Sequence, residues 1–224
     1  MKILFAGSPQ SSAEILKDLY KHKCKIVGVI SQPDKRSRRG GGKDPSAVSA
    51  MAIKLGLPLF KPMNIDEEFK GAISNIHCDF LIVSAYGKIL PDWFLLHPSI
   101  SSINIHFSLL PKYRGASPIQ SSLLNGDLQT GISIMKMTTG LDEGPVYSSN
   151  QINIPNNADK NKLETKLIEA ANEILFSSLL DISKNKKLPT PQDASAASYC
   201  NKITKSSGEV NFLEEDADTI LRKF

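Results

Sequence analysis

Residues 102–115 of this 224-residue chain read SINIHFSLLPKYRG, and they set both the expected fold and the expected site. Ile103 and Ile105 alternate with Asn104 and His106. The alternation predicts a β-strand, because residues two apart in a strand share one face. Asn104 and His106 should therefore project side by side, away from the isoleucines, just before a turn that contains a proline. An amide and an imidazole on one face indicate a polar site, although a single buried structural histidine is the competing interpretation.

The segments around this stretch predict a mostly parallel α/β sheet. An apolar strand at 2–6, a helix at 11–20 and a second strand at 25–30 form a β-α-β start, which is typical of parallel sheets with helices on their faces. Residues 79–85 are largely apolar, as expected for a central strand buried on both faces. The turn after the first strand has one glycine and no GxGxxG motif, which argues against NAD binding. We therefore expect a Rossmann-like, mostly parallel sheet with helices on both faces.

The other elements follow from periodicity and turn residues. The predicted helices are 46–55, 65–76, 116–124 and 159–180, and the predicted strands are 57–60, 131–137 and 146–154. The segment 183–198 is polar and contains two prolines, which is typical of a linker.

Composition and cysteine spacing narrow the class of protein. The three cysteines are not spaced as C-x-x-C, which argues against a disulfide framework and a zinc site and fits a reducing cytoplasm. The apolar run at the N-terminus is too short for a signal peptide, and no run approaches the roughly 20 apolar residues that a membrane helix needs. We therefore expect a cytoplasmic protein without a membrane segment or a metal.

Residues 35–43 read KRSRRGGGK and concentrate positive charge in a chain whose net charge is +4. The cations are Lys35, Arg36, Arg38, Arg39 and Lys43. Such a loop can follow the phosphate backbone of an RNA, or it can be a solvated charged surface, and composition alone does not decide between the two. The run has no aromatic residue, so base stacking is not its expected mode of contact.

Asp142 adds an acid to the polar pair on the strand. It lies between Gly140 and Gly144, in a turn that follows the predicted strand at 131–137. If this strand neighbours the one that ends at His106, the amide, the imidazole and the carboxylate converge at one edge of the sheet. No serine or cysteine stands in an obvious nucleophile elbow. The set instead suits direct acyl transfer, in which it polarises a carbonyl and stabilises an oxyanion without a covalent enzyme intermediate.

Several motifs closely resemble those of the 10-formyltetrahydrofolate-dependent formyltransferases. The residues that carry this resemblance are NIHFSLLPKYRGASPIQ at 104–120, TGISIMKM at 130–137 and GLDEG at 140–144. More narrowly, the motifs FAGSP at 5–9, SQPD at 31–34, AYGKILP at 85–91 and ASPIQ at 116–120 resemble the methionyl-tRNA formyltransferases within that superfamily. The similarity extends over nearly the whole chain.

The resemblance implies that a monomer transfers a formyl group, without a metal, from 10-formyltetrahydrofolate to the amino group of initiator methionyl-tRNA. Asn104 and a protonated His106 are implied to donate to the oxyanion, while Asp142 orients His106 and helps to remove the amine proton. The implied folate contacts are Ser108, Leu109, Leu110, Pro111, Ala85, Tyr86, Gly87, Ile89, Leu90, Thr139 and Gly140. The cations of residues 35–43 are implied to contact the acceptor end of the tRNA.

The sequence departs from the family pattern in three places. Phe107 follows the histidine where the family has a small residue, although strand alternation points it away from His106. The basic loop has one cation fewer near its end. The family also has a C-terminal β-barrel, and this chain ends where the linker to that barrel is expected to begin. We therefore expect a catalytic domain at 1–188, and at 189–224 a linker and the start of a truncated C-terminal region, with a strand at 209–212 and a helix from 216.

Three other functions remain open at this point. A sugar-nucleotide N-formyltransferase performs the same chemistry on another amine, but it gives no reason for the basic loop. A non-catalytic folate- or RNA-binding fragment would bind its ligand without turnover. A formyltetrahydrofolate hydrolase uses water as the acceptor and usually carries a regulatory domain ahead of the catalytic one, which this chain is not expected to have.

Overall fold

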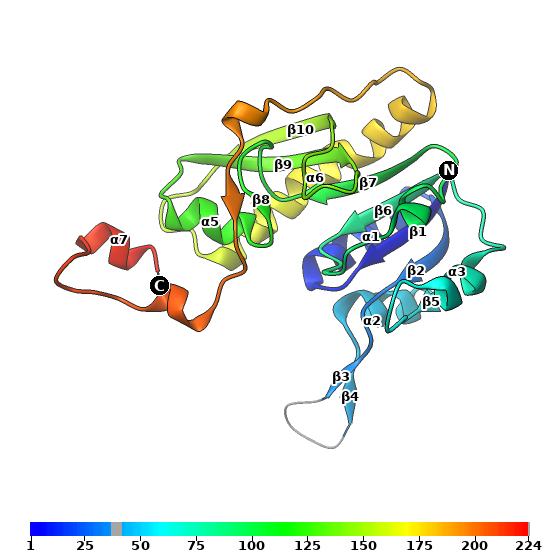
Figure 1. Ribbon diagram of the computed structural model, residues 1–224, viewed down its shortest axis with the longest axis horizontal. Coiled ribbons are helices and arrows are strands. Elements are labelled where there is room, and N and C mark those ends of the chain that lie inside the picture. Colours follow the sequence, from blue (N-terminus) through cyan, green and yellow to red (C-terminus); the bar gives the residue numbers. More distant parts are fainter. Residues whose placement is uncertain (37–41, 224) are drawn as a thin grey trace.

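The computed structural model describes residues 1–36 and 42–223, and its main feature is a sheet of seven strands (Figure 1). The strands are β1 (Lys2–Gly7), β2 (Lys25–Ile30), β5 (Leu59–Phe60), β6 (Phe80–Ser84), β7 (Ser101–His106), β9 (Gln129–Lys136) and β10 (Val146–Asn153). Their order across the sheet is β10-β9-β7-β6-β1-β2-β5. The strands from β7 to β5 pair in parallel, whereas β9 runs antiparallel to both β7 and β10. This arrangement confirms the predicted Rossmann-like, mostly parallel sheet.

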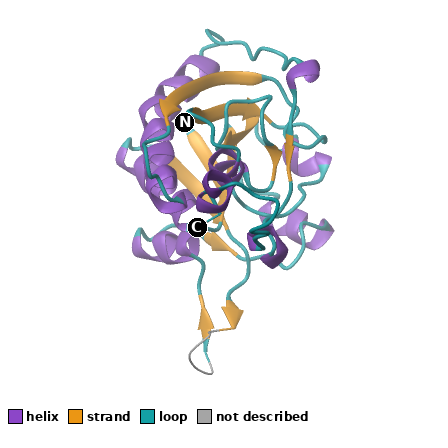
Figure 2. Cartoon of the chain, turned by 90° about the vertical axis from the view of Figure 1, so that its left-hand side faces the viewer, coloured by secondary structure: helices purple, strands orange, loops and turns teal. Residues whose placement is uncertain are grey.

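Helices cover both faces of the sheet (Figure 2). They include α1 (Gln10–Lys21), α2 (Ala47–Lys54), α3 (Glu67–Ile73), α4 (Asp92–Leu95), α5 (Pro118–Leu124) and α6 (Lys160–Ser183). On β1, Ile3 and Phe5 belong to the core that also contains residues of α1, α2 and α6. Leu4 and Ala6, which point to the opposite face, belong to a second core with residues of α3 and α4. Within the described residues, no helix is both long and apolar enough to cross a membrane.

The start of α6 shows how the sequence fixes one of these helices. The carboxylate of Asp159 accepts a hydrogen bond from the backbone N–H of Lys162 at 2.8 Å, which satisfies one of the free donors of the first turn. Leu163 and Leu167 on this helix have no exposed surface. The helix packs on β9 and β10, and so supports the side of the sheet that carries the loop with Asp142.

Some predicted elements differ from the structure. The strand β5 and the helix α3 are shorter than 57–60 and 65–76. The side chain of Asp66 accepts from the backbone N–H of Phe69 and so sets the start of α3. The helix α4 was not predicted. The strand predicted at 209–212 was wrong: these residues follow a 3-10 turn at Lys205–Gly208, and Phe212 is 79% exposed. A strand needs a neighbour to pair with, and local sequence alone does not provide one.

The segment after α6 runs back across the end of the sheet. Thr190 pairs with Val146, and the short strand β11 (Tyr199–Cys200) pairs in parallel with β8 (Arg114–Gly115). The helix α7 (Ala217–Leu221), inside the region predicted to be helical, lies beyond α5 at one end of the molecule (Figure 1). The division at residue 188 stays a prediction, with contacts joining its two sides.

The ends of the basic run form a hairpin that projects from the body of the molecule (Figure 1). Its strands β3 (Lys35–Arg36) and β4 (Lys43–Asp44) are antiparallel, and all four of their residues are exposed. Arg38 and Arg39, which were predicted to contact RNA, lie outside the described residues.

Candidate active site

Asn104, His106 and Asp142 come together at the end of β7. Asn104 Nδ2 donates a hydrogen bond to Asp142 Oδ1 at 3.2 Å, and His106 Nδ1 lies 3.6 Å from Asp142 Oδ2. The backbone N–H of Gly115 donates to the same Oδ2 at 2.9 Å. Asp142 therefore links the amide, the imidazole and the loop after β7 in one polar cluster.

The alternation along β7 places its polar side chains as predicted. Ile103, Ile105 and Phe107 are buried in the core on the side of α1 and α6. Asn104 and His106 point to the other face, which is why Phe107 does not crowd the imidazole.

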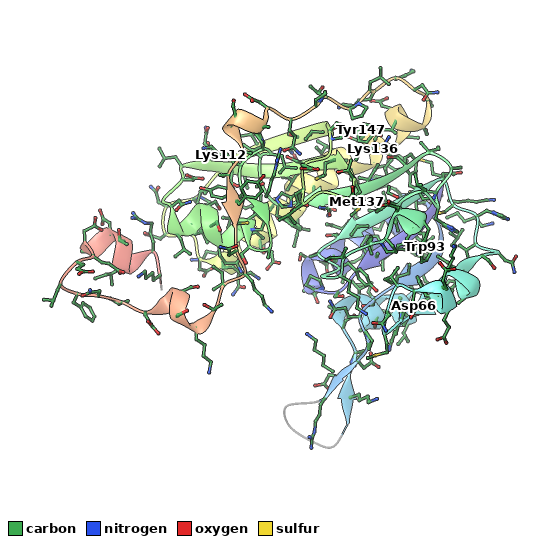
Figure 3. The ribbon with its side chains drawn as sticks, viewed as in Figure 1. Asp66, Trp93, Lys112, Lys136, Met137 and Tyr147 are labelled. Atoms are coloured by element: carbon green, nitrogen blue, oxygen red, sulfur yellow. The ribbon has the colours of Figure 1, made fainter. Side chains whose placement is uncertain are left out.

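The loop after β9 brings Asp142 to this cluster. The strand β9 is indeed the neighbour of β7, but it is antiparallel, and its last residue, Lys136, pairs with Ile103 in the first half of β7. The loop that begins at Met137 must therefore turn back along the sheet to bring Asp142 to His106 (Figure 3 labels Lys136 and Met137). The predicted convergence of the three groups beside two neighbouring strands is confirmed, and the return of the loop is what brings the acid into place.

The turn that carries Asp142 has an unusual backbone. Asp142 has φ +48°, in the left-handed region that non-glycine residues rarely adopt. A Cβ at Gly144 would overlap the carbonyl oxygen of Lys136, so this position requires glycine for close backbone approach. The surrounding contacts must therefore hold the aspartate in a costly conformation.

The hydrogen bonds of His106 assign its tautomer. Nε2 lies 2.8 Å from the carbonyl oxygen of Tyr113, and since a carbonyl only accepts, Nε2 must carry a hydrogen. Nδ1 is then the nitrogen that faces Asp142. The ring is 5% exposed, so its orientation is fixed by these two partners.

A cleft of about 610 Å³ lies beside the cluster and is lined by Asn104, His106 and Asp142. It also contains seven of the residues predicted to contact folate, namely Ala85, Tyr86, Gly87, Ile89, Leu90, Thr139 and Gly140. The loops after β1 and β6 contribute to it, as expected for ligand sites at the carboxyl ends of parallel strands. Ile89 and Leu141 are 95% and 61% exposed and form apolar parts of its wall.

The loop after β6 is held in a tight turn at the rim of the cleft. Ala85 and Gly87 have φ +43° and +77°, and the side chain of Gln32 donates to the carbonyl oxygen of Tyr86 at 2.7 Å. The Tyr86 ring is buried in the second core, and burial raises the pKa of its hydroxyl to about 12. Within the described residues this hydroxyl has no hydrogen-bond partner.

The predicted folate contacts at Ser108, Leu109, Leu110 and Pro111 do not line the cleft. Ser108 Oγ donates to the carbonyl oxygen of Lys112 at 2.6 Å. Ser133 on β9 accepts from the backbone N–H of Leu110 at 3.0 Å and donates to the carbonyl oxygen of Ser108 at 2.8 Å. These contacts fasten the turn after β7 to its neighbouring strand, and a folate contact for the four residues stays a prediction.

Two further residues near the cluster were not found from the sequence. Arg114 is 4% exposed, and its guanidinium donates from Nε and Nη2 to Gln192 Oε1 at 3.0 and 2.9 Å. Arg114 lies within the stretch that was singled out, and only its charge could have drawn attention to it. Gln192 lies in a segment that the sequence predicts to be a linker, and no local signal points to it.

The described cations that were predicted to contact RNA do not line the cleft beside the polar cluster. Lys35, Arg36 and Lys43 are exposed on the hairpin. A second hollow of about 510 Å³ contains Lys35 together with Pro9 and Ala85, and the last two also line the cleft. The base of the hairpin is therefore adjacent to the cleft. Among residues 1–36 and 42–223, no three histidine, cysteine or acidic side chains gather as metal ligands would.

Comparison with known proteins gives matches over the whole chain. A family model described as formyl transferase matches residues 1–179. A methionyl-tRNA formyltransferase from Dictyoglomus thermophilum is 42% identical over 214 residues, which are 95% of this chain and 68% of that protein. Another from Thermotoga maritima is 39% identical over 224 residues, which are 100% of this chain and 71% of that protein.

The solved structures that match share the fold. An N-formyltransferase from Helicobacter canadensis in complex with folinic acid and dTDP-3-aminofucose has a TM-score of 0.73 at 17% identity, and the match covers 100% of this chain and 79% of that one. Glycinamide ribonucleotide transformylase 1 from Symbiobacterium toebii has a TM-score of 0.68 at 17% identity over 86% of this chain and 93% of that one.

Proposed function

The chain belongs to the formyl transferase family, and we propose that it transfers the formyl group of 10-formyltetrahydrofolate to the free amino group of methionyl-tRNA. The observation that carries this proposal is the cluster of Asn104, His106 and Asp142 on the wall of a ligand-sized cleft. The substrate assignment rests on relatives that are about 40% identical over nearly all of the chain.

The cleft has the size and chemistry for a folate donor. Its volume of about 610 Å³ falls in the range of roughly 300–1,000 Å³ that is usual for ligand pockets. Leu90, Ile89 and Leu141 offer apolar surface to a flat ring. The turn at Ala85–Gly87 and the loop at 138–142 add backbone groups that can pair with the ring's polar edge.

The side chains of the cluster can perform the separate steps of an acyl transfer. When bound, 10-formyltetrahydrofolate supplies the formyl carbon, which gains a bond to the amine nitrogen and loses its bond to N10. Asn104 gives one N–H to Asp142, so its second N–H can donate to the negative charge that develops on the formyl oxygen. A donor aimed at such a charge contributes about 3 kcal/mol, or at least a hundredfold in rate.

His106 is assigned to proton transfer in this scheme. Its Nε2–H donates a hydrogen bond to the carbonyl oxygen of Tyr113. Nδ1 is therefore the nitrogen that can take the proton released by the attacking amine and deliver it to the leaving N10. Asp142 lies 3.6 Å from Nδ1 and stabilises the charged ring while it holds the proton. This role replaces the implied donation from a protonated His106 to the oxyanion.

The acceptor is proposed to approach past the basic hairpin. Lys35, Arg36 and Lys43 are exposed there, and the hollow at the base of the hairpin adjoins the cleft. Cations on a projecting hairpin can bind the phosphates of an acceptor stem while its end enters the cleft. We assign the same contact to Arg38 and Arg39, which lie outside the described residues. We also propose that the reaction takes place in the cytoplasm, and that the protein is a monomer whose catalytic domain is residues 1–188.

The test is a direct assay of formyl transfer. The chain is incubated with 10-formyltetrahydrofolate and initiator methionyl-tRNA, and N-formylmethionine is measured after deacylation of the tRNA. We expect formylation of methionyl-tRNA and none of a dTDP-amino sugar. Transfer to the amino sugar alone would replace the proposed acceptor, and folate binding without transfer to either would identify a binding module.

A further inference from the structure

The segment at 190–200 lies outside the matched family region and packs against both loops of the active site. Its Thr190 exchanges two backbone hydrogen bonds with Val146, each 2.8 Å long. The backbone N–H of Arg114 donates to Ser198 at 2.8 Å, and that of Ala116 donates to Cys200 at 3.1 Å. The segment therefore joins the loop after β7, whose Tyr113 carbonyl oxygen accepts from His106, to the loop after β9, which contains Asp142.

Gln192 makes the central side-chain contacts between these two loops. Its Nε2 donates to the carbonyl oxygen of Asp142 at 2.8 Å and to that of Gly144 at 2.7 Å. Its Oε1 accepts two hydrogen bonds from the guanidinium of Arg114. Both donors and both acceptor sites of the amide are therefore used.

The chemistry of the partners fixes the orientation of this amide. An arginine can only donate and a backbone carbonyl can only accept, so exchanging Oε1 and Nε2 would break all four contacts. The charge of Arg114 also polarises the amide, because a group that accepts from a cation becomes a stronger donor at its other end. Within the described residues Arg114 has no carboxylate as an ion-pair partner. Besides Gln192, its guanidinium donates to Tyr199 Oη at 3.3 Å.

The carbonyl that Gln192 binds belongs to the residue with the strained backbone. Asp142 has φ +48°, and a residue in that region persists only when its surroundings hold it there. Two groups of Asp142 accept hydrogen bonds from Arg114's neighbours. Its carbonyl oxygen accepts from Gln192, and its Oδ2 accepts from the backbone N–H of Gly115. The direction of the carboxylate toward Asn104 and His106 depends on both contacts.

We propose that Gln192 is a positioning residue for the reaction, which holds the Asp142 turn against the charge of Arg114 and so fixes the carboxylate at His106. This inference rests on the proposed function, because it assigns Gln192 a role in the same formyl transfer. It places part of the active site in a segment that the sequence predicts to be a linker.

The decisive variant is Gln192→Glu, because it keeps the acceptor for Arg114 and removes the donor to the carbonyl oxygens of Asp142 and Gly144. A glutamate keeps, and adds charge to, the contact with Arg114, but it turns two acceptors toward the carbonyl oxygens of Asp142 and Gly144. Gln192→Ala removes both sides at once. The matched control is Asn150→Ala: Asn150 is also a side-chain amide that donates to a backbone carbonyl, that of Ala170 at 3.1 Å, but it lies outside the cleft lining.

Formyl transfer to methionyl-tRNA and the thermal unfolding midpoint are measured for all four proteins. We expect Gln192→Glu to unfold at a higher temperature than Gln192→Ala, yet to lose kcat by about tenfold to a hundredfold, at least as much as the alanine variant, because small misplacements of catalytic groups have such effects. The KM for the folate donor should change less than kcat. Asn150→Ala should retain wild-type kcat whatever its stability.

The outcomes separate this inference from the proposed function. If the wild-type chain formylates methionyl-tRNA and Gln192→Glu is more active than Gln192→Ala, activity follows stability and the positioning role is overturned. Wild-type kcat in Gln192→Glu overturns it as well. If the wild-type chain itself forms no N-formylmethionyl-tRNA, the proposed function fails first.

Discussion

The active-site cluster and the basic hairpin are two polar regions of this molecule that are built in opposite ways. The cluster gathers Asn104 and His106 from β7 and Asp142 from the loop after β9, and Gln192 from the segment after α6 binds the Asp142 turn. Its contacts join residues that are far apart in the sequence, and His106 is 5% exposed. The hairpin instead pairs two strands of two residues each, a few positions apart, with all four residues exposed.

The difference matches what each region is proposed to do. Catalytic groups must be in place before the substrate arrives, since their value lies in fixed geometry. Cations that bind a phosphate backbone need only reach it, because the attraction does not depend on one exact arrangement. We therefore expect substitutions in the cluster to affect rate or folding sharply, and substitutions in the hairpin to affect neither.

The strongest test of this contrast is to remove a catalytic side chain. Asn104→Ala and His106→Ala should each lower the rate of formyl transfer at least a hundredfold, about 3 kcal/mol, because each removes a group that acts on the reacting atoms. The unfolding midpoint should change little for Asn104→Ala, since that side chain is only partly buried. Single-turnover formylation of methionyl-tRNA measures the rate.

Asn153→Ala is the matched control, because Asn153 is an exposed asparagine at the end of β10. It should transfer formyl groups at the wild-type rate. Near-wild-type turnover in Asn104→Ala or in His106→Ala would refute the assignment of that residue.

Two glycines test how tightly each region is packed. Gly115 has φ +121°, and a Cβ there would overlap the carbonyl oxygen of Cys200. Gly115→Ala should therefore lower the free energy of unfolding by about 3 kcal/mol, from strained backbone and forced separation of β8 and β11. Gly42 in the hairpin has no atom of the described residues within 4 Å of a built Cβ, so Gly42→Ala should change stability by less than about 0.5 kcal/mol.

Urea unfolding of the two glycine variants measures the difference. Equal losses of stability would mean that the hairpin is as closely packed as the loop beside Asp142, and the contrast between the two regions would not hold.

Tyr86 lies where the two regions meet, since its carbonyl oxygen accepts from Gln32 at the base of the hairpin. Burial raises the pKa of its hydroxyl to about 12, above the usual value of about 10. The unfolded chain therefore releases this proton first, so stability is unaffected below about pH 10 and declines by about 1.4 kcal/mol per pH unit until about pH 12.

Tyr86→Phe should remove this alkaline loss and keep the hydrogen bond from Gln32, which uses the backbone. At neutral pH the variant should be as stable as the wild type or slightly more stable, because the buried hydroxyl has no partner within the described residues. Chemical unfolding between pH 8 and pH 12 measures both effects. The same alkaline slope in both proteins would show that Tyr86 titrates normally.

The sequence predicted the parts of the site that depend on local pattern. Alternation alone placed Asn104 and His106 on one face of β7, opposite Ile103 and Ile105. The position of Asp142 relative to them could not be predicted in the same way, because it depends on the direction of β9 and on how its loop turns back. Nothing in a single strand's pattern gives the direction of its neighbour.

Gln192 was missed for a related reason. Its segment has the prolines and polar residues of a linker, and its role depends on partners that are 50 and 78 positions away. The strand predicted at 209–212 is the opposite case, because its local pattern suits a strand but the segment pairs with no strand of the sheet. Local patterns predicted the sheet well, whereas the contacts that complete the site are long-range.

The smallest expected effects on the chain itself come from the hairpin. Changing Lys35, Arg36 and Lys43 together to alanine should leave the unfolding midpoint and the rate at saturating methionyl-tRNA unchanged, because these residues are exposed. Affinity for the tRNA should fall, and the slope of log affinity against log salt concentration should flatten by about one for each cation that contacts a phosphate. Binding measured over a range of salt concentrations gives the slope.

A second triple variant distinguishes contact from general attraction. Lys21, Lys25 and Lys54 are exposed near the ends of α1 and α2 and the start of β2. They therefore lie at the amino ends of the parallel strands, whereas the cleft lies at the carboxyl ends. Their replacement by alanine removes the same net charge, so a tRNA attracted only by overall charge would lose affinity equally from both variants. A flatter slope in the hairpin variant alone would place the phosphates on the hairpin, and equal slopes in all three proteins would leave its cations as solvated surface.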